Sequence, residues 1–463
     1  MAEEKGKRLW DKGEVTEQGV LEFTVGDDPV QDQQLVGWDA IASSAHARML
    51  CEIGILEEEE ALKLIQSLEE IFLEAEQGKF EIPYELEDCH GAIEARLVEK
   101  TGQAGKKIHT GRSRNDQVLV ASRLYLKNSL VLILEELRTF AEVVLERVEK
   151  DRSVEMPGYT HMQQAMPTTI GVWLGSFAEW SLELIEQGVS LYHNIDSNPL
   201  GAASGFGTPL GLNRNRTTDL LGFDRVQRNP VNVQNSRGRA ELKALHWCSD
   251  IGLLLEKLSW DLILYSTAEF NFFTLPESIT TGSSIMPQKH NPDVLELIRA
   301  RVARIRGSAS ELEWVIGKLP SNYHRDFQYT KSPVFRGIKD TLESIRLIEL
   351  AVRSFTINEQ VLDNSRTPEL YATYAAFRKV KEGKAFRDAY KETADELNAG
   401  KIIPEDYADD LNVIIKENEK ELSEAKAELT RLSKKVAAKK EKFEKVRAAA
   451  FEKKFSWTKK LFG

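Results

Sequence analysis

Apolar side chains recur every three or four residues along several unusually long stretches of this chain. In the range 117–150 the stripe consists of Leu126, Leu130, Ile133, Leu137, Phe140, Val144 and Val148. This spacing places the stripe on one face of an α-helix. Further stripes predict helices over the ranges 168–195, 239–265, 294–312 and 334–355. Because long helices bury such faces against neighbours of similar length, the pattern predicts a mainly α chain built on an elongated bundle.

Shorter helical patterns flank this predicted bundle. Helices are expected over residues 39–55 and 57–77, whereas residues 1–36 read as polar and irregular. After Thr356 the pattern shortens again to small helices, and strand signals are sparse throughout. We therefore expect an N-terminal helical domain, a central long-helix bundle, a small C-terminal helical domain and a charged tail, over residues 1–110, 111–357, 358–410 and 411–463.

The tail has a heptad pattern. Apolar residues recur every seven positions at Ile415, Leu422, Leu429, Val436 and Phe443. Such a repeat suits a coiled coil, although Asn418 and Lys439 interrupt the seam. A single solvated helix and a helix folded back on the body fit equally well. Aromatic residues among lysines over 455–462 could also dock on a partner or a membrane surface.

Charge and cysteine usage exclude several classes of protein. The net charge of −11 argues against nucleic-acid binding. The three cysteines lie far apart without a CxxC pair, which supports neither a disulfide framework nor a zinc ribbon. Residues 87–90 with Glu94 could offer metal ligands, but no second cluster completes a site, so no metal is expected. No stretch approaches the apolar length of a membrane span, so we expect a soluble, cytoplasmic protein.

The loop at residues 282–293 contains more side chains that can bind a ligand or transfer a proton than any other stretch. Its sequence is GSSIMPQKHNPD, which brings together two hydroxyls, an ammonium and an amide. Asn291 followed by Pro292 is typical of an N-cap and a first helical residue. These groups beside a helix N-terminus suit a substrate that carries or develops negative charge. An ordinary polar surface loop remains the alternative.

Two other stretches concentrate reactive residues. The range 109–116, HTGRSRND, combines arginines, hydroxyls and an amide, which is a composition that suits a carboxylate. The range 157–163, PGYTHMQ, places His161 in a turn, where acid, base or ligand work is as plausible as a packing role. A solvated loop whose arginines pair with neighbouring acids is the alternative for the first stretch.

Taken together, these three stretches resemble the three signature regions of argininosuccinate lyases, in the fumarase and aspartase superfamily. The matching segments are HTGRSRNDQ, PGYTHMQQAMP and GSSIMPQKHNPD, and the likeness covers roughly residues 8–400. It implies a three-domain helical fold that assembles as a homotetramer, with each active site shared between subunits. The implied reaction is the β-elimination of argininosuccinate to arginine and fumarate, the last step of arginine biosynthesis, with no cofactor and no metal.

The resemblance also implies roles for individual residues. Ser283 is the expected general base, Lys289 stabilises the carbanion, and His161 with Glu296 is the candidate general acid. The expected substrate-binding residues are Asp88, Ser113, Arg114, Asn115, Thr160, Asn291, Tyr323, Gln328 and Lys331.

Some positions depart from the family pattern. His290 replaces the usual lysine and Met162 the usual leucine, and the segment from Phe23 to Leu35 looks longer than usual, so its substrate contacts are not carried over. The tail from about residue 411 matches nothing in that pattern. The alternatives are another fumarate-releasing lyase, adenylosuccinate lyase or aspartase, and a non-catalytic structural relative.

Overall fold

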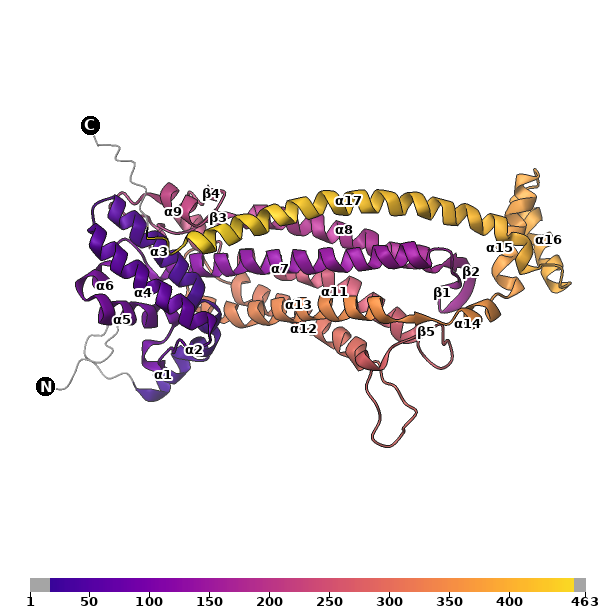
Figure 1. Cartoon of the computed structure of the whole chain (residues 1–463), viewed down its shortest axis with the longest axis horizontal. Helices are drawn as coiled ribbons and strands as arrows, with labels where there is room; N and C mark the ends of the chain where they lie inside the picture. The colour runs from indigo at the N-terminus through magenta and orange to yellow at the C-terminus, as the bar shows by residue number, and fades with distance from the viewer. Residues whose placement is uncertain (1–16, 454–463) are drawn as a thin grey trace.

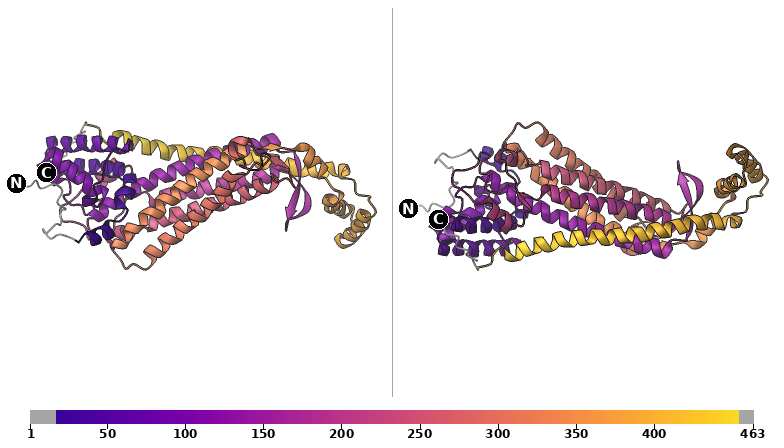
Figure 2. Two further views of the ribbon diagram at one scale, coloured as in Figure 1. Left: turned by 90° about the horizontal axis from the view of Figure 1, so that it is seen from below. Right: turned by 90° about the horizontal axis from the view of Figure 1, so that it is seen from above.

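The computed structural model describes residues 17–453 as a long, mainly helical molecule whose central helices run lengthwise (Figure 1). Two further views show the same elongated bundle from below and from above (Figure 2). The prediction of a mainly α chain is confirmed. The aromatic residues over 455–462 lie outside the described residues.

Five long helices form the central bundle. They are α7 (Arg114–Asp151), α8 (Ile170–Ile195), α11 (Arg239–Tyr265), α12 (Asp293–Gly317) and α13 (Lys331–Ser354). The stripe of α7 is buried as predicted, and it shares one apolar core with residues from the other four helices. Burial of its apolar face against neighbouring helices therefore stabilises each of these long helices.

Helix α7 is an exception to the expectation that no stretch approaches the apolar length of a membrane span. An 18-residue window of α7 has a mean hydropathy of 1.3 and is long and apolar enough to cross a membrane. However, 78% of that window is buried inside the protein. Its apolar residues therefore face other helices, as in the core of a soluble bundle.

The N-terminal end is more helical than its sequence suggested. The prediction of an irregular segment is wrong for residues 17–36, which hold two short helices and a 3₁₀ turn before α3, whereas residues 1–16 lie outside the described residues. The elements of this end are α1 (Gln18–Val25), α2 (Asp28–Gln31), η1 (Asp32–Gln34), α3 (Val36–Glu52), α4 (Glu58–Glu76), η2 (Tyr84–Leu86), α5 (Cys89–Thr101) and α6 (Gln103–Lys107). They surround a second apolar core built mainly from α3, α4 and α5.

Short strands connect the long helices. Strands β1 (Glu155–Thr160) and β2 (Gln163–Thr169) form an antiparallel hairpin between α7 and α8. The sequence pattern did not predict this hairpin. The smaller connections are β3 (Ser197–Asn198), α9 (Arg214–Leu220), β4 (Arg225–Val226), α10 (Pro230–Gln234), β5 (Phe273–Thr274), η3 (Glu277–Ile279), η4 (Arg325–Thr330) and β6 (Thr356–Ile357). Strands β3 and β4 pair in parallel, and β5 and β6 pair antiparallel.

The C-terminal part begins with small helices and ends with the longest helix of the described chain. The elements are α14 (Glu359–Asn364), α15 (Pro368–Lys381), α16 (Phe386–Asn398), η5 (Pro404–Tyr407) and α17 (Ala408–Ala449). Helix α17 folds back along α8 and α7 and returns to the N-terminal end (Figure 1). Leu422, Leu429, Leu432 and Val436 join the central core. The heptad stripe is thus covered by the chain's own body.

Candidate active site

The loop before α12 holds the hydroxyl of Ser283 in a tight turn. Ser283 Oγ accepts backbone N–H groups of Ile285 at 3.3 Å and Met286 at 3.1 Å. A hydroxyl oxygen that already faces two N–H donors is better placed to carry negative charge than a free one. Thr281 and Asn291 close the loop by exchanging backbone hydrogen bonds of 3.0 and 2.8 Å. The loop therefore has a fixed base and an exposed tip.

The other reactive groups of this loop face solvent within the single chain. Lys289 is exposed, and its backbone N–H donates to the carbonyl of Met286 at 3.1 Å. Glu296 lies exposed in the first turn of α12. The expectation that Asn291 caps this helix is wrong by one residue. Pro292 is the N-cap, and the side-chain amide of Asn291 donates to the Gly282 carbonyl at 3.4 Å instead.

His161 lies at the tip of the β1–β2 hairpin, next to Thr160. His161 and Met162 form the two-residue turn, and both have positive φ, at 56° and 60°. Two-residue hairpin turns of this kind favour Asn and Gly, so a histidine there is under backbone strain. Thr160, His161 and Met162 are all exposed. The hairpin thus presents the imidazole away from its own chain's core.

A third group of predicted residues lies where α5 and α7 begin. Asp88 is the N-cap of α5, and its Oδ1 accepts the Gly91 N–H at 2.7 Å. The guanidinium of Arg114 donates to the same carboxylate. Ser113 caps α7 by accepting the Asn115 N–H at 3.3 Å. Two helix N-termini therefore converge here, which favours negative charge nearby.

Asp116 connects this group to the glycine-rich loop over residues 198–211. Its Oδ1 accepts the backbone N–H of Ser113, and its Oδ2 accepts those of Gly201 and Ala203, each at 2.9 Å. Burial raises the pKa of Asp116 to about 6, although these hydrogen bonds lower it. The loop is therefore held against the start of α7 by a buried acceptor.

Lys331 at the start of α13 joins the same end of the molecule. Its ammonium is buried and contacts Asp32 Oδ1 at 2.6 Å and Asp28 Oδ1 at 3.0 Å. Burial lowers the pKa of Lys331, but the two carboxylates outweigh it and the net shift is upward. Asp28 and Asp32 were not predicted as site residues, because only the fold brings them to a lysine 299 residues away.

Gln328 and Tyr323 extend this group. The Gln328 amide donates to the backbone carbonyls of Thr24 at 3.0 Å and Val25 at 2.9 Å. The ring of Tyr323 lies 5.5 Å from the buried guanidinium of Arg237. Gln328 therefore ties η4 to α1 beside the Lys331 cluster.

The predicted residues thus form three separate groups in one chain. The Lys331 and Asp88 group lies at the N-terminal end, and the His161 hairpin lies at the opposite end (Figure 1). The loop with Ser283 projects from the bundle between them (Figure 1). The hydrogen bonds and ion pairs of the described residues include none between His161, at the tip of the β1–β2 hairpin, and Glu296, in the first turn of α12. A site that uses all three groups needs more than one copy of the chain.

Comparisons with known proteins bear on the family and the fold of the chain. A family model described as Lyase matches residues 9–307. An argininosuccinate lyase of Sorangium cellulosum (strain So ce56) is 42% identical over 392 residues, covering 85% of this chain and 91% of that relative. The crystal structure of an EDDS lyase in complex with formate has a TM-score of 0.74 at 22% identity, covering 93% of this chain and 95% of that one. A class II fumarase from Schistosoma mansoni has a TM-score of 0.71 at 16% identity, covering 84% and 93% of the two chains.

Proposed function

The chain belongs to the argininosuccinate lyase family, and we propose that its Ser283 loop starts the β-elimination that splits argininosuccinate into arginine and fumarate. The protein is a carbon–nitrogen lyase. The reaction needs a base for a proton beside a carboxylate, donors for the carbanion that results, and an acid for the departing nitrogen. The alternatives, adenylosuccinate lyase and aspartase, have no support among the relatives reported above.

The observation that carries the base assignment is the pair of N–H groups around Ser283 Oγ. A serine is a weak base unless its alkoxide is stabilised, and two backbone donors with a nearby ammonium lower the free energy of that alkoxide. Lys289 lies on the same loop and supplies the ammonium, which also balances charge on the substrate carboxylate. Asn291 contributes a neutral donor beside it.

His161 is the proposed acid for the departing guanidine nitrogen, with Glu296 as its partner. The strained turn at the hairpin tip supports a functional role, because non-glycine residues with positive φ concentrate at such sites. Thr160 is the neighbouring substrate ligand. The histidine of one copy would meet the glutamate of another.

The N-terminal group is the proposed binding region for the rest of the substrate. Its members offer cations, hydroxyls and amides together with carboxylates, which suits a molecule that carries both carboxylates and a guanidinium. The proposed ligands are Asp88, Ser113, Arg114, Asn115, Tyr323, Gln328 and Lys331.

We infer a homotetramer whose active sites are shared between subunits. The separation of the three groups within one chain supports this arrangement. The bundle also exposes large apolar residues on α11 and α12, with Trp260 54%, Leu297 61% and Trp314 79% exposed. Such a surface is typical of an interface. Cys51, Cys89 and Cys248 are buried free thiols, which suits the cytoplasm as the proposed location.

The test is to mix purified protein with argininosuccinate, adenylosuccinate or aspartate and follow fumarate by its ultraviolet absorbance. We expect release from argininosuccinate alone, and a fall in kcat of about 10²- to 10⁴-fold in Ser283→Ala. His290→Ala, in the same exposed loop, is the control and keeps the rate. Release from another substrate would select the alternative lyase, and no release at all would favour a structural relative.

A further inference from the structure

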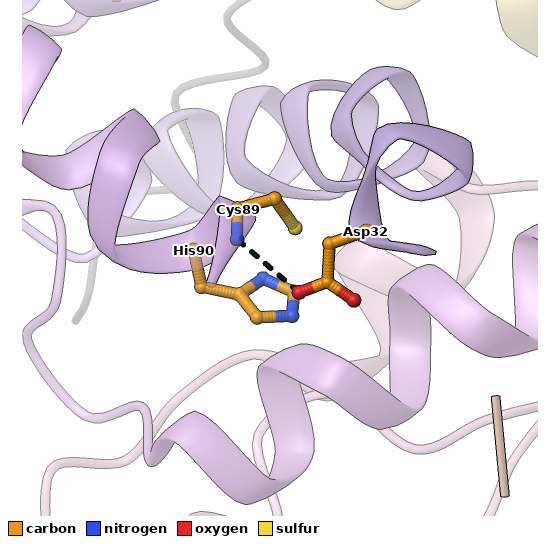
Figure 3. Close-up of side chains that lie close together, drawn as sticks. All are labelled: Asp32, Cys89 and His90. Carbon is orange, nitrogen blue, oxygen red and sulfur yellow. Dashed lines mark hydrogen bonds between the residues drawn. The ribbon is translucent and has the colours of Figure 1, made fainter. Parts of the chain in front are cut away.

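Three metal-ligating side chains converge where η1 meets the start of α5. They are Asp32, Cys89 and His90, and one donor atom of each lies within 4.8 Å of the others. Figure 3 shows the carboxylate of Asp32 beside the imidazole of His90, with the sulfur of Cys89 on the same side. Their exposed fractions are 0%, 0% and 1%. The described residues contain no other group of this kind.

The imidazole of His90 is oriented as metal-binding histidines are. Its Nδ1 lies 2.8 Å from Asp39 Oδ2. A carboxylate accepts hydrogen bonds, so Nδ1 carries a proton, and in the neutral ring the lone pair is then at Nε2. That Nε2 is buried and has no hydrogen-bond partner in the described structure. A buried acceptor without a partner is costly, and a carboxylate that fixes the tautomer from behind is the usual support of a metal ligand.

We propose that Asp32, Cys89 and His90 form a binding site for a divalent zinc ion, with a water in the fourth position. Oxygen, sulfur and nitrogen donors together suit zinc, whereas magnesium and calcium prefer oxygen alone. Binding replaces the Cys89 S–H bond with a sulfur–metal bond and releases that proton to solvent. No redox change is involved.

The contacts already made by Asp32 leave lone pairs that can bind the ion. Its Oδ1 accepts from Lys331 at 2.6 Å, and its Oδ2 accepts the backbone N–H of Cys89 at 3.2 Å. Each carboxylate oxygen has a further lone pair. Asp28 and Asp39 add two carboxylates close by, and Asp28 keeps its own contact of 3.0 Å with Lys331. The local charge therefore accommodates a cation beside the lysine.

Zinc at this position inhibits the lyase, and this second part rests on the proposed function. The ion draws electron density from Asp32 and repels the ammonium of Lys331, which is a proposed substrate ligand. The proposed metal ligand Asp32 therefore contacts the proposed substrate ligand Lys331 directly. Occupancy by metal and productive binding of substrate exclude one another.

The first experiment replaces zinc with cobalt(II), which has visible spectra. After treatment with a chelator and removal of the chelator, the full-length protein is titrated with cobalt chloride and its absorbance is recorded. We expect a thiolate-to-cobalt charge-transfer band that saturates at one ion per chain. The Cys89→Val variant loses the band, whereas Cys248→Val, the same change at another buried thiol outside any such cluster, keeps it.

The second experiment measures fumarate release from argininosuccinate in the presence of zinc chloride. Wild-type protein and Cys248→Val lose activity, and Cys89→Val needs about 100-fold more zinc for the same loss. No cobalt band in the wild type, or an equal band in Cys89→Val, overturns the site. A band without inhibition overturns the regulatory part alone. The band does not depend on activity, so failure of the proposed lyase function leaves the binding result intact.

Discussion

The single ammonium of Lys331 contacts two carboxylates, those of Asp28 and Asp32, so it offsets only part of their negative charge. Burial raises the pKa of Asp28 from 3.8 to about 6, against the lowering by Lys331. The folded state therefore binds more protons than the unfolded state between about pH 4 and pH 6. The free energy of unfolding falls as pH rises through this window.

Asp28→Asn is expected to flatten this pH dependence. The folded protein loses a group whose ionisation costs about 3 kcal/mol, so its stability changes less between about pH 4 and pH 6. Thermal unfolding midpoints recorded across this range provide the measurement. Asp27→Asn removes an exposed neighbouring carboxylate and should keep the wild-type slope. An unchanged slope in Asp28→Asn would show that other groups control it.

The sequence predicts the site residues that belong to local motifs. It does not predict the site residues that only the fold brings together. Ser283 and His161 were found because their neighbours carry the same chemistry within a few positions. Asp32 has no such neighbours in the sequence, and a role for it is indicated only by its hydrogen bonds with Lys331 and Cys89. The sequence pattern at residues 87–90 offered no further ligand nearby, and only the fold brings Asp32 close to Cys89 and His90.

Among the elements, long helices were predictable and short ones were not. The stripes of α7, α8, α11, α12 and α13 repeat over many turns, so the helical period is unmistakable. Helices α1 and α2 hold too few residues for a period to appear and depend on packing. The β1–β2 hairpin was missed because its prolines hide the strand alternation and its turn has neither Asn nor Gly.

The hairpin turn itself can be tested by relieving its strain. Met162→Gly is expected to raise stability by about 1 kcal/mol, because glycine adopts a positive φ without steric cost. Met162 is 64% exposed, so little buried area is lost. Met162→Ala keeps the Cβ atom and with it the strain. Differential scanning calorimetry on both variants makes the comparison. A lower unfolding temperature for Met162→Gly would contradict the turn geometry.

Helix α17 should contribute strongly to the stability of the bundle. Leu432 is fully buried in the central core, so Leu432→Ala leaves a cavity and is expected to cost about 2–5 kcal/mol. Thr430→Ala, two residues away on the exposed side, should cost far less. Denaturant midpoints of the two variants measure the difference. Equal midpoints would mean that α17 does not pack in solution as described.

For the whole molecule, the separation of the three site groups predicts complementation between inactive variants. His161 is exposed and Ser283 is partly exposed, so neither His161→Ala nor Ser283→Ala should unfold the chain. Co-expression with two different tags gives mixed oligomers in which some sites receive both intact groups. Two-tag purification followed by a fumarate assay should show activity well above either variant alone. Activity no higher than that of the single variants would place each site within one subunit.

Helix α17 also has a consequence for how the protein is made. Ser44 donates to the carbonyl of Ala450 at 2.6 Å across 406 positions, and Trp38 contacts Phe443 with ring centroids 5.5 Å apart. At a synthesis rate of about 5–20 residues per second, the first helices wait roughly 20–80 s for these partners. The N-terminal end therefore leaves the ribosome with an apolar surface that stays open until α17 has been synthesised. A nascent chain of this kind is a natural client for chaperones, and slow codons within the α17 coding segment would prolong that dependence.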